Sequence, residues 1–358
     1  MPTMMHGIKV HGHLRAIACL NPMKKRILIL SHDNKIGDAI VMTGLFKPLH
    51  ALWPNCEMGV LCGTSNAALY RHHPDVKWLH IAKSRNVFAR IWASLQARMK
   101  RYDLVVHFGL DLANPSVQIV LNLVHAKQRF LFLSHPHPRS NDVVMLGQWG
   151  YSADHETLHY SARHVRFLQT LGAQAAPYAY DIHLPKDVAT EAPRGDGLLM
   201  VINSQSSAAN KSFSLPWLHA FVMAVYHQHP KLRMQLLSAS PALEVAMHEM
   251  FRAQADRVWV APFAPTVTPS LALIQNADLV VTPDTYAVHA ASAWNKPVLA
   301  LYEPSVLSVV SWEPLSDSYA QIIAPNGQAV SDIPLPAVMQ ALNHLLAEPR
   351  SRARVFLN

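Results

Sequence analysis

Three short polar segments of the sequence carry residue types that could accept a proton or bind an anion. The first, 35–38, ends on the carboxylate of Asp38. The second is the polar loop 203–213, which contains Lys211, and the third is 282–289, Thr-Pro-Asp-Thr-Tyr-Ala-Val-His. A carboxylate can act as a general base, and a lysine can stabilise charge that develops on a leaving phosphate. The residue types therefore indicate proton abstraction combined with stabilisation of an anion.

Asp38 stands at the start of an expected helix, after Gly37, which permits a tight turn. A helix N-terminus would keep this carboxylate ionised at neutral pH, which secures a proton acceptor but also makes it a weaker base. Such a base suffices if the attacked carbon is already cationic in the transition state and the proton leaves late. The alternative is that Asp38 only caps the helix, because Asp is favoured there on local grounds.

Lys211 lies in a polar loop between an expected strand and a helix opened by Pro216. It could pair with a diphosphate and stabilise the charge that grows on a leaving nucleotide, an effect that is largest in a closed cleft. The alternative is a solvated loop lysine, since most lysines are exposed.

The segment 282–289 is typical of a strand, a turn and a helix. Asp284 or Thr285 can cap that helix, and the first free N–H groups, near 285–287, would face an anion docked at that end. Thr285 and His289 are four residues apart and so share a helix face. The alternative is a capped helix with a satisfied histidine in the core.

Short apolar runs alternate with amphipathic stretches on both sides of these segments, which predicts a parallel sheet with helices on both faces. Ligands collect beyond the carboxyl ends of such strands, where the three polar segments fall. In the first half we expect strands at 26–31, 57–61, 103–108 and 129–133, and helices at 38–52, 87–99, 117–124 and 160–171.

The alternation repeats in the second half, after a stretch at 185–197 that collects Pro, Gly and charged residues. We therefore expect an extension at 1–23, a first domain at 24–184, a linker at 185–197 and a second domain at 198–358. Within the second domain we expect strands at 198–203, 232–237, 258–260, 278–282 and 298–302, and helices at 216–227, 241–255, 271–275 and 285–294.

The composition fits two domains and an anionic partner. The chain has 358 residues, half of them apolar, and 31 basic against 23 acidic residues give a formal charge of +8. Cys19, Cys56 and Cys62 follow no CxxC pattern, so we expect neither a disulfide frame nor a zinc site. Their number and spacing fit a protein of a reducing compartment. No export signal and no membrane span is readable.

Two further clusters each have an ordinary interpretation. His72-His73 and His135-Pro-His137 lack additional spaced ligands, so we expect no metal there. A basic run in the first domain is either a solvated helix face or a landing surface for a phosphorylated saccharide or anionic lipid. This run consists of Lys83, Arg85, Arg90, Arg98, Lys100 and Arg101.

The ordered set of motifs resembles glycosyltransferase family 9, the ADP-heptose:lipopolysaccharide heptosyltransferases, over roughly residues 24–345. Tyr286 departs from that pattern, because many relatives have Gly at this position. The motifs that carry the resemblance are Arg26-Ile-Leu-Ile-Leu, Ile36-Gly-Asp-Ala-Ile-Val-Met-Thr43, Tyr102-Asp-Leu-Val-Val106, His164-Val-Arg-Phe-Leu-Gln-Thr-Leu-Gly172, Lys211, Ala277-Asp-Leu-Val-Val-Thr-Pro-Asp-Thr285, His289 and Lys296-Pro-Val-Leu-Ala-Leu-Tyr302.

The resemblance implies an α/β fold of GT-B architecture, two Rossmann-like domains facing a central cleft, and an inverting reaction without a metal or another cofactor. In this pattern Asp38 matches the catalytic base and Lys211 the phosphate-binding lysine. Donor binding is expected from Ser204, Asp284, Thr285, Tyr286 and His289, and acceptor binding from His107 and Lys35.

The resemblance further implies transfer of a sugar, heptose by expectation, from an ADP-sugar such as ADP-heptose to a lipopolysaccharide core or related surface glycan. The expected partners are this donor and an anionic glycolipid acceptor, with no nucleic acid. The expected location is the cytoplasm, and peripheral contact with the cytoplasmic face of the inner membrane stays open. Two alternatives remain: a nucleotide-sugar epimerase of the same architecture, and a non-catalytic nucleotide- or glycan-binding member of the family.

Overall fold

The computed structural model consists of two compact units, Met1–Ala179 and Tyr180–Asn358. The division precedes the segment 185–197, which was expected to be the linker and of which 189–195 lie outside the described residues. The predicted domain bounds therefore stay predictions. The structure describes residues 10–11, 25–31, 34–83, 86–108, 115–133, 142–146, 159–173, 178–188, 196–348 and 352–357.

The described part of unit 1 contains a seven-stranded sheet of order β1-β7-β6-β5-β2-β3-β4. All neighbours are parallel except β1, which pairs antiparallel with β7 and comes from the predicted extension. The strands are β1 (Val10–His11), β2 (Arg26–Ser31), β3 (Glu57–Gly63), β4 (Val76–Ala82), β5 (Leu104–His107), β6 (Gln128–Leu133) and β7 (Asp142–Leu146).

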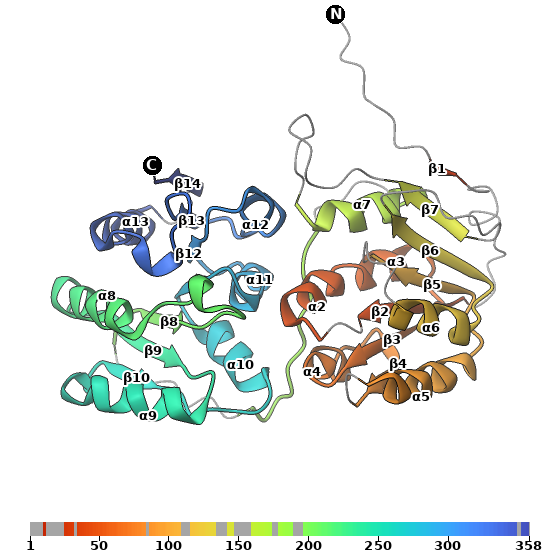
Figure 1. The fold of residues 1–358 in the computed structure, drawn as a ribbon, viewed down its shortest axis with the longest axis horizontal. Helices are drawn as coiled ribbons and strands as arrows, with labels where there is room; N and C mark the ends of the chain where they lie inside the picture. The colour runs from red at the N-terminus through yellow and green to blue at the C-terminus, as the bar shows by residue number, and fades with distance from the viewer. Residues whose placement is uncertain are drawn as a thin grey trace, which may run out of the picture. The chain divides into compact units, whose positions relative to one another are not determined.

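Helices flank this sheet on both sides, with α2, α4 and α7 on one and α5 and α6 on the other (Figure 1). The expected helix 38–52 is in fact two helices, interrupted at 44–45. The helices are α2 (Ile36–Thr43), α3 (Phe46–Leu52), α4 (Ala67–Arg71), α5 (Val87–Arg98), α6 (Pro115–Val124) and α7 (Ser161–Thr170).

Unit 2 contains an all-parallel sheet of order β10-β9-β8-β11-β12-β13-β14 in its described residues. Its central strands are buried and consist almost entirely of apolar residues, as expected for parallel strands covered on both faces. The strands are β8 (Leu199–Asn203), β9 (Arg233–Leu237), β10 (Val258–Val260), β11 (Leu279–Pro283), β12 (Val298–Tyr302), β13 (Tyr319–Ile323) and β14 (Arg352–Phe356).

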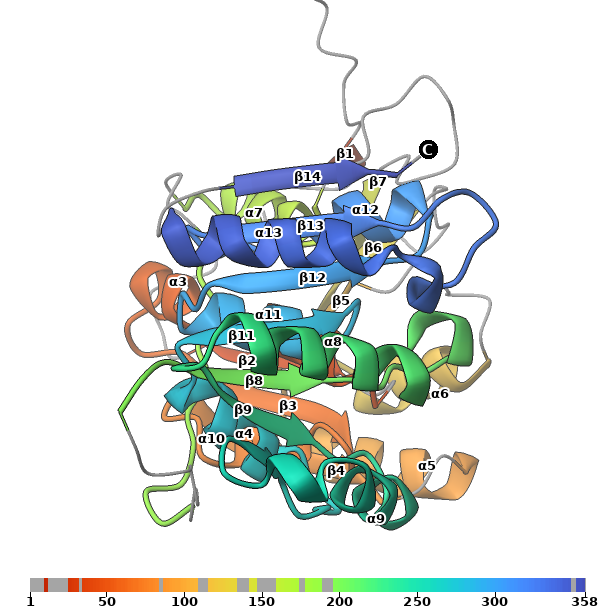
Figure 2. The ribbon, with the colours of Figure 1, turned by 90° about the vertical axis from the view of Figure 1, so that its left-hand side faces the viewer.

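In unit 2, α8, α9 and α13 cover one face of the sheet and α10, α11 and α12 the other (Figures 1 and 2). None of the described helices of the chain combines the length and apolar character needed to cross a membrane. The helices are η1 (Ala209–Lys211), α8 (Leu215–Gln228), α9 (Pro241–Met250), η2 (Arg252–Gln254), α10 (Thr268–Asn276), α11 (Tyr286–Ala293), α12 (Val306–Ser311), η3 (Val330–Asp332) and α13 (Leu335–Ala347).

Both sheets reverse their strand order at one point, between β2 and β5 in unit 1 and between β8 and β11 in unit 2. Loops diverge at such a switch point, which leaves a crevice outside the carboxyl ends of the strands where ligands bind. In unit 1, α2 follows β2, and β5 ends on His107. In unit 2, Lys211 lies in the connection after β8, and Asp284 follows β11. The topology thus brings the predicted site residues of each unit to one edge of its sheet.

Two of the three cysteines lie within the described residues. Cys56 and Cys62 are buried free thiols, and burial raises the pKa of Cys56 to about 11 and that of Cys62 to about 12. Such thiols are protonated and unreactive at neutral pH. Cys19 lies outside the described residues, as do Arg85, His135 and His137.

Candidate functional site

The side chain of Asn203, the last residue of β8, bridges the switch point of unit 2. Its amide donates to Thr282 Oγ1 at 3.2 Å and to Thr285 Oγ1 at 2.9 Å, and so joins the ends of β8 and β11. Thr285 is the N-cap of α11, and its hydroxyl accepts the N–H of Ala287 at 3.2 Å. Thr285, rather than Asp284, therefore caps this helix, and the N–H of Ala287 is already satisfied.

Lys211, at the end of η1, faces two carboxylates. Its Nζ lies 2.5 Å from Glu303 Oε1 and 4.0 Å from Asp284 Oδ2, and the neighbouring Asn210 donates to Glu303 Oε2 at 2.9 Å. The Lys211 side chain is only 25% exposed. It is therefore held in place by charge, unlike a freely solvated loop lysine.

Glu303 had no assigned role in the sequence, although it follows directly after the buried strand β12. Because β12 lies beside β11, its carboxyl end meets the same edge of the sheet as Asp284. Its position as a polar residue just after a buried apolar strand could have identified Glu303 as a candidate site residue from the sequence. We call Lys211, Asp284 and Glu303 the lysine–carboxylate cluster.

Asp284 has a perturbed acidity. The pKa of its carboxyl is raised from 3.8 to about 6, chiefly by burial. The charge of Lys211 and a hydrogen bond with Ser308 oppose this shift, and the charge of Glu303 adds to it. The cluster therefore holds two carboxylates against one lysine, and one of them is close to protonation near neutral pH. An anion that binds beside Lys211 would favour the neutral form of Asp284.

The loop that carries Lys211 folds back on itself through its serines. Ser212 Oγ accepts the N–H of Ser206 at 2.9 Å and donates to Ala208 O at 2.8 Å. The N–H of Phe213 donates to Ser204 O at 2.8 Å, and Phe213 is buried. These bonds fix the backbone before Lys211. Ser204, predicted to bind the donor, is itself buried at the base of this loop.

Tyr286 and His289 both lie on α11, one turn apart. Tyr286 is half-buried; burial raises the pKa of its phenol, and a hydrogen bond with the Ser270 side chain opposes that shift. The His289 ring is buried, with the Tyr180 ring centroid at 5.9 Å and that of Trp312 at 5.5 Å. These surroundings resemble the core histidine of the ordinary interpretation, and donor binding by either residue stays a prediction.

In unit 1, Asp38 lies in the first turn of α2 and is half-buried. The N-cap of this helix is Lys35, whose side chain makes no capping hydrogen bond; its Nζ lies 3.8 Å from Asp38 Oδ2. Gly37 does not form the expected tight turn, because it already belongs to the helix. The left-handed residue of the preceding loop is Asn34, with φ 62°. Asn tolerates this conformation better than most residues.

A buried arginine that had no predicted role lies near Asp38. Burial lowers the pKa of the Arg163 guanidinium, and the nearby Tyr160 and the negative charge of Asp38 oppose that shift. Arg163 Nη1 also lies 3.5 Å from Phe108 O, just after β5. A positive guanidinium beside a carboxylate favours the ionised carboxylate, the form that accepts a proton.

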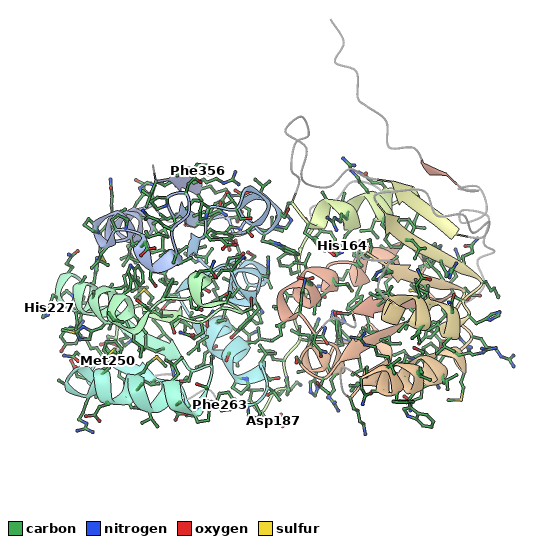
Figure 3. All side chains as sticks on the ribbon, viewed as in Figure 1. His164, Asp187, His227, Met250, Phe263 and Phe356 are labelled. Atoms are coloured by element: carbon green, nitrogen blue, oxygen red, sulfur yellow. The ribbon has the colours of Figure 1, made fainter. Side chains whose placement is uncertain are left out.

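Contacts from distant parts of unit 1 set the position of α2. The Tyr178 hydroxyl donates to Val41 O at 2.8 Å and lies 2.7 Å from Nδ1 of His164, a residue of α7 that Figure 3 labels. Because that hydroxyl has a single proton, His164 donates the second hydrogen bond. At Gly44, which ends α2, a Cβ would collide with the Tyr178 ring. A residue with no side chain there allows this close approach.

The two residues predicted to bind the acceptor lie in different surroundings. Lys35 is exposed at the start of α2, whereas His107 is buried at the end of β5, opposite Leu131 of β6. The structure brings His107 to the same sheet edge as α2 but keeps it in the interior. Acceptor binding by both residues stays a prediction.

Residues 179–333 match the family model "Glycosyltransferase family 9 (heptosyltransferase)". The matched segment begins at the boundary between the two units and includes Asn203, the lysine–carboxylate cluster and α11. The match covers most of unit 2. The resemblance to glycosyltransferase family 9 that the motifs predicted is thereby confirmed.

Relatives extend the similarity over most of the chain. A provisionally named lipopolysaccharide heptosyltransferase 4 of Escherichia coli K12 is 22% identical over 343 residues, covering 90% of this chain and 87% of that protein. The structure of a family 9 glycosyltransferase from Veillonella parvula matches with a TM-score of 0.75 at 16% identity, covering 90% of this chain and 98% of the other.

Two structures of E. coli enzymes match with similar quality. ADP-heptose lps heptosyltransferase II has a TM-score of 0.69 at 18% identity, over 91% of this chain and all of that chain. The structure of heptosyltransferase WaaC with ADP has a TM-score of 0.68 at 17% identity, and the match covers 89% of this chain and 99% of that chain. At these identities the matches establish the fold, so the predicted α/β fold of GT-B class is confirmed.

Proposed function

We propose that this protein is an inverting, metal-independent glycosyltransferase that moves heptose from an ADP-sugar to a lipopolysaccharide core or related surface glycan. One observation carries the proposal: the lysine–carboxylate cluster and the Thr285 cap gather at the switch point of the sheet that matches family 9. Structures of the related WaaC contain ADP and ADP-2-deoxy-2-fluoro heptose, which supports an ADP-sugar as donor.

The proposed reaction is a single displacement. The acceptor hydroxyl oxygen attacks the anomeric carbon while the bond from that carbon to the diphosphate oxygen breaks, and this inverts the carbon. Asp38 takes the proton of the attacking hydroxyl. Negative charge grows on the departing nucleoside diphosphate, and Lys211 stabilises it together with the N-terminus of α11.

We infer that the lysine–carboxylate cluster changes its pairing when the donor binds. In the free protein Lys211 is neutralised by Glu303 and Asp284. A diphosphate brings negative charge to the same place, so Lys211 turns toward it and Asp284, whose pKa is already about 6, takes up a proton. Lys211 together with the helix N-terminus then supplies the positive charge for which other enzymes use a metal ion.

On the acceptor side we propose that Lys35 binds an anionic group of the glycolipid and that His107 shapes the pocket behind it. Lys35 is exposed, carries its charge at the start of α2 and lies three residues before the proposed base. We also propose a cytoplasmic reaction, as the family resemblance implies.

The test begins with the nucleotide. We expect ADP or an ADP-sugar to raise the melting temperature more than the UDP or GDP species, because a ligand that binds only the folded state stabilises it by mass action. Equal shifts for all three bases would contradict the adenine assignment.

The second step is an ADP-sugar panel with and without core glycan, in which products are identified by mass. The proposal expects a mass increase on the glycan equal to one sugar residue. Conversion of the donor without any glycan would instead indicate an epimerase. Donor binding without turnover under all conditions would indicate a binding protein.

A further inference from the structure

Helix α5 presents a continuous apolar stripe to solvent. Phe88 is 76% exposed, Trp92 65%, Leu95 40% and Met99, just after the helix, 72%. Their spacing of four, three and four residues places all of them on one face of the helix. Single exposed apolar residues are common on protein surfaces. Four large ones along one face of a helix form an apolar patch, and such patches are typical of interaction sites.

The opposite face of the same helix explains why this stripe points outward. Ala93, Ser94 and Ala97 are fully buried, and α5 contacts β3 and β4 at the edge of the sheet. Small residues allow α5 to pack closely on the strands. The large apolar residues are thus excluded from the core, although a core would be their ordinary place.

The sequence that contains the stripe is basic. Between Asp75 and Asp103 the sequence has no acidic residue but seven Lys or Arg. Lys83, Arg98 and Arg101 are exposed, and none of the three forms an ion pair with another described residue. An apolar stripe on a helix whose sequence is basic and lacks acidic residues is typical of a helix that lies in the interface of an anionic membrane.

We propose that α5 docks unit 1 on an anionic lipid bilayer, with Phe88, Trp92, Leu95 and Met99 inserted among the acyl chains and Lys83, Arg98 and Arg101 at the headgroups. A second copy of the chain fits this face poorly. In a symmetric dimer each patch meets its own equivalent, so basic residues would oppose basic residues. A bilayer with anionic headgroups satisfies the apolar stripe and the charge together.

The experiment is sedimentation of the full-length protein with vesicles. One set contains phosphatidylethanolamine with about 30% phosphatidylglycerol, and the other contains phosphatidylcholine only. We expect binding to the anionic vesicles, little binding to the neutral ones, and weaker binding at about 0.5 M NaCl, because salt screens the headgroup charge.

Two double variants separate the apolar and the basic contributions. Phe88→Ser with Trp92→Ser should weaken binding about 10-fold or more, because it removes two aromatic side chains from the acyl region. Arg98→Gln with Arg101→Gln should weaken binding to anionic vesicles about 10-fold and leave residual neutral binding unchanged. The matched control is Val245→Ser, an equally exposed apolar residue on α9 of unit 2, which should bind like the parent.

Three outcomes would overturn the proposal: no binding of the parent to anionic vesicles, equal binding to both vesicle types, or parent-like binding of the Phe88/Trp92 variant. A dimer that dissociates in this variant, seen by analytical ultracentrifugation without vesicle binding, would assign the stripe to self-association instead. Normal melting of the variant is expected because these side chains contribute little to the core.

This docking surface does not depend on the proposed reaction. If vesicles bind but no sugar is transferred, the proposed function fails and the membrane contact stands. If a water-soluble acceptor is glycosylated equally well by the parent and the Phe88/Trp92 variant while only the parent sediments with vesicles, both proposals hold.

Discussion

The two sheets of this protein have the same strand order around their switch points, but the edges at those points are built differently. In unit 2 a hydrogen bond joins Asn203 to Thr285 at this edge, and Glu303 pairs with Lys211 and accepts a hydrogen bond from Asn210. In unit 1 the proposed base, Asp38, stands on a helix whose position depends on packing against distant residues. The family model matches only unit 2, beginning at residue 179.

The difference fits the two proposed tasks. The diphosphate of the donor nucleotide is the same in every turnover, so a fixed set of charges and helix-terminal N–H groups can bind it. For a base that removes one proton, correct placement matters more than a large number of polar partners. A site built of many polar side chains also leaves a stronger sequence signature than one that depends on how a helix is packed.

The largest expected effect concerns the base in unit 1. Asp38→Asn keeps the shape of the side chain but cannot accept a proton, so turnover should fall about 100-fold to 10,000-fold, with donor affinity nearly unchanged. The helix should persist, because Lys35 and not Asp38 is its N-cap. Steady-state kinetics and a donor-binding titration measure the two quantities.

The matched control is Asp187→Asn, an exposed aspartate labelled in Figure 3, which should behave like the parent. Turnover of Asp38→Asn within a few-fold of the parent, with normal melting, would eliminate Asp38 as the base. The search would then move to His107 at the end of β5.

The next effect concerns unit 2. Lys211→Ala should weaken donor binding about 10-fold to 100-fold, the range for one charge-assisted contact, and reduce turnover as well. Lys211→Arg should restore part of the affinity, because its guanidinium keeps the charge with a different geometry. Lys231→Ala, at an exposed lysine of the same unit, is the control. Unchanged kinetics in a folded Lys211→Ala protein would refute the phosphate role.

A pH titration tests the lysine–carboxylate cluster. The pKa of Asp284 is raised to about 6, so its neutral form dominates below that pH. We expect affinity for ADP-ribose, whose doubly esterified diphosphate keeps its charge here, to fall about 10-fold as the pH rises through 6, because the carboxylate that forms repels it. Isothermal titration calorimetry between pH 5 and about 8 measures this.

Asp284→Asn should flatten that pH profile, whereas Glu303→Gln should retain the inflection because Asp284 still titrates. The same shift affects stability. A raised folded-state pKa contributes stability that is present below the unfolded value of 3.8 and is lost as the pH rises through about 6. Relative to Asp284→Asn, the parent should therefore lose about 1–3 kcal/mol of unfolding free energy across that window.

The smallest expected effect concerns the support of α2. Tyr178→Phe removes the hydrogen bond to Val41 O and leaves His164 without that acceptor, so the unfolding free energy should fall by about 1–2 kcal/mol. Turnover should drop a few-fold with donor affinity unchanged, because only the position of Asp38 is affected. Tyr226→Phe, which loses an exposed contact with Asp256 in unit 2, should cost less in urea denaturation. Equal losses would show that α2 is positioned by its own sequence.

Much of the fold was determined by the sequence alone. Strands β2, β8, β11 and β12 are short apolar runs, and their predicted bounds agree with the structure to within a residue. Strand β4 was not predicted because polar residues interrupt this strand, which lies at the sheet edge. Strand β13 was not predicted either; its Gln321 is buried and donates to Val309 O, a bond that only the tertiary structure provides.

The pairing within the site was decided by topology. Lys211 and Asp284 stood out by residue type, but Glu303 lies 92 residues after Lys211 and meets it only because β12 lies beside β11. Likewise, no local pattern shows that the Tyr178 ring packs against Gly44 at the end of α2.

Helix α5 is the clearest example of a feature that the sequence alone did not determine. A helix was predicted at 87–99, and large apolar residues such as Phe88, Trp92, Leu95 and Met99 ordinarily lie in a core. The structure buries Ala93, Ser94 and Ala97 instead. Residue spacing defines which side chains share a face of a helix, but which face turns inward depends on how the helix packs against its neighbours, here β3, β4 and α6.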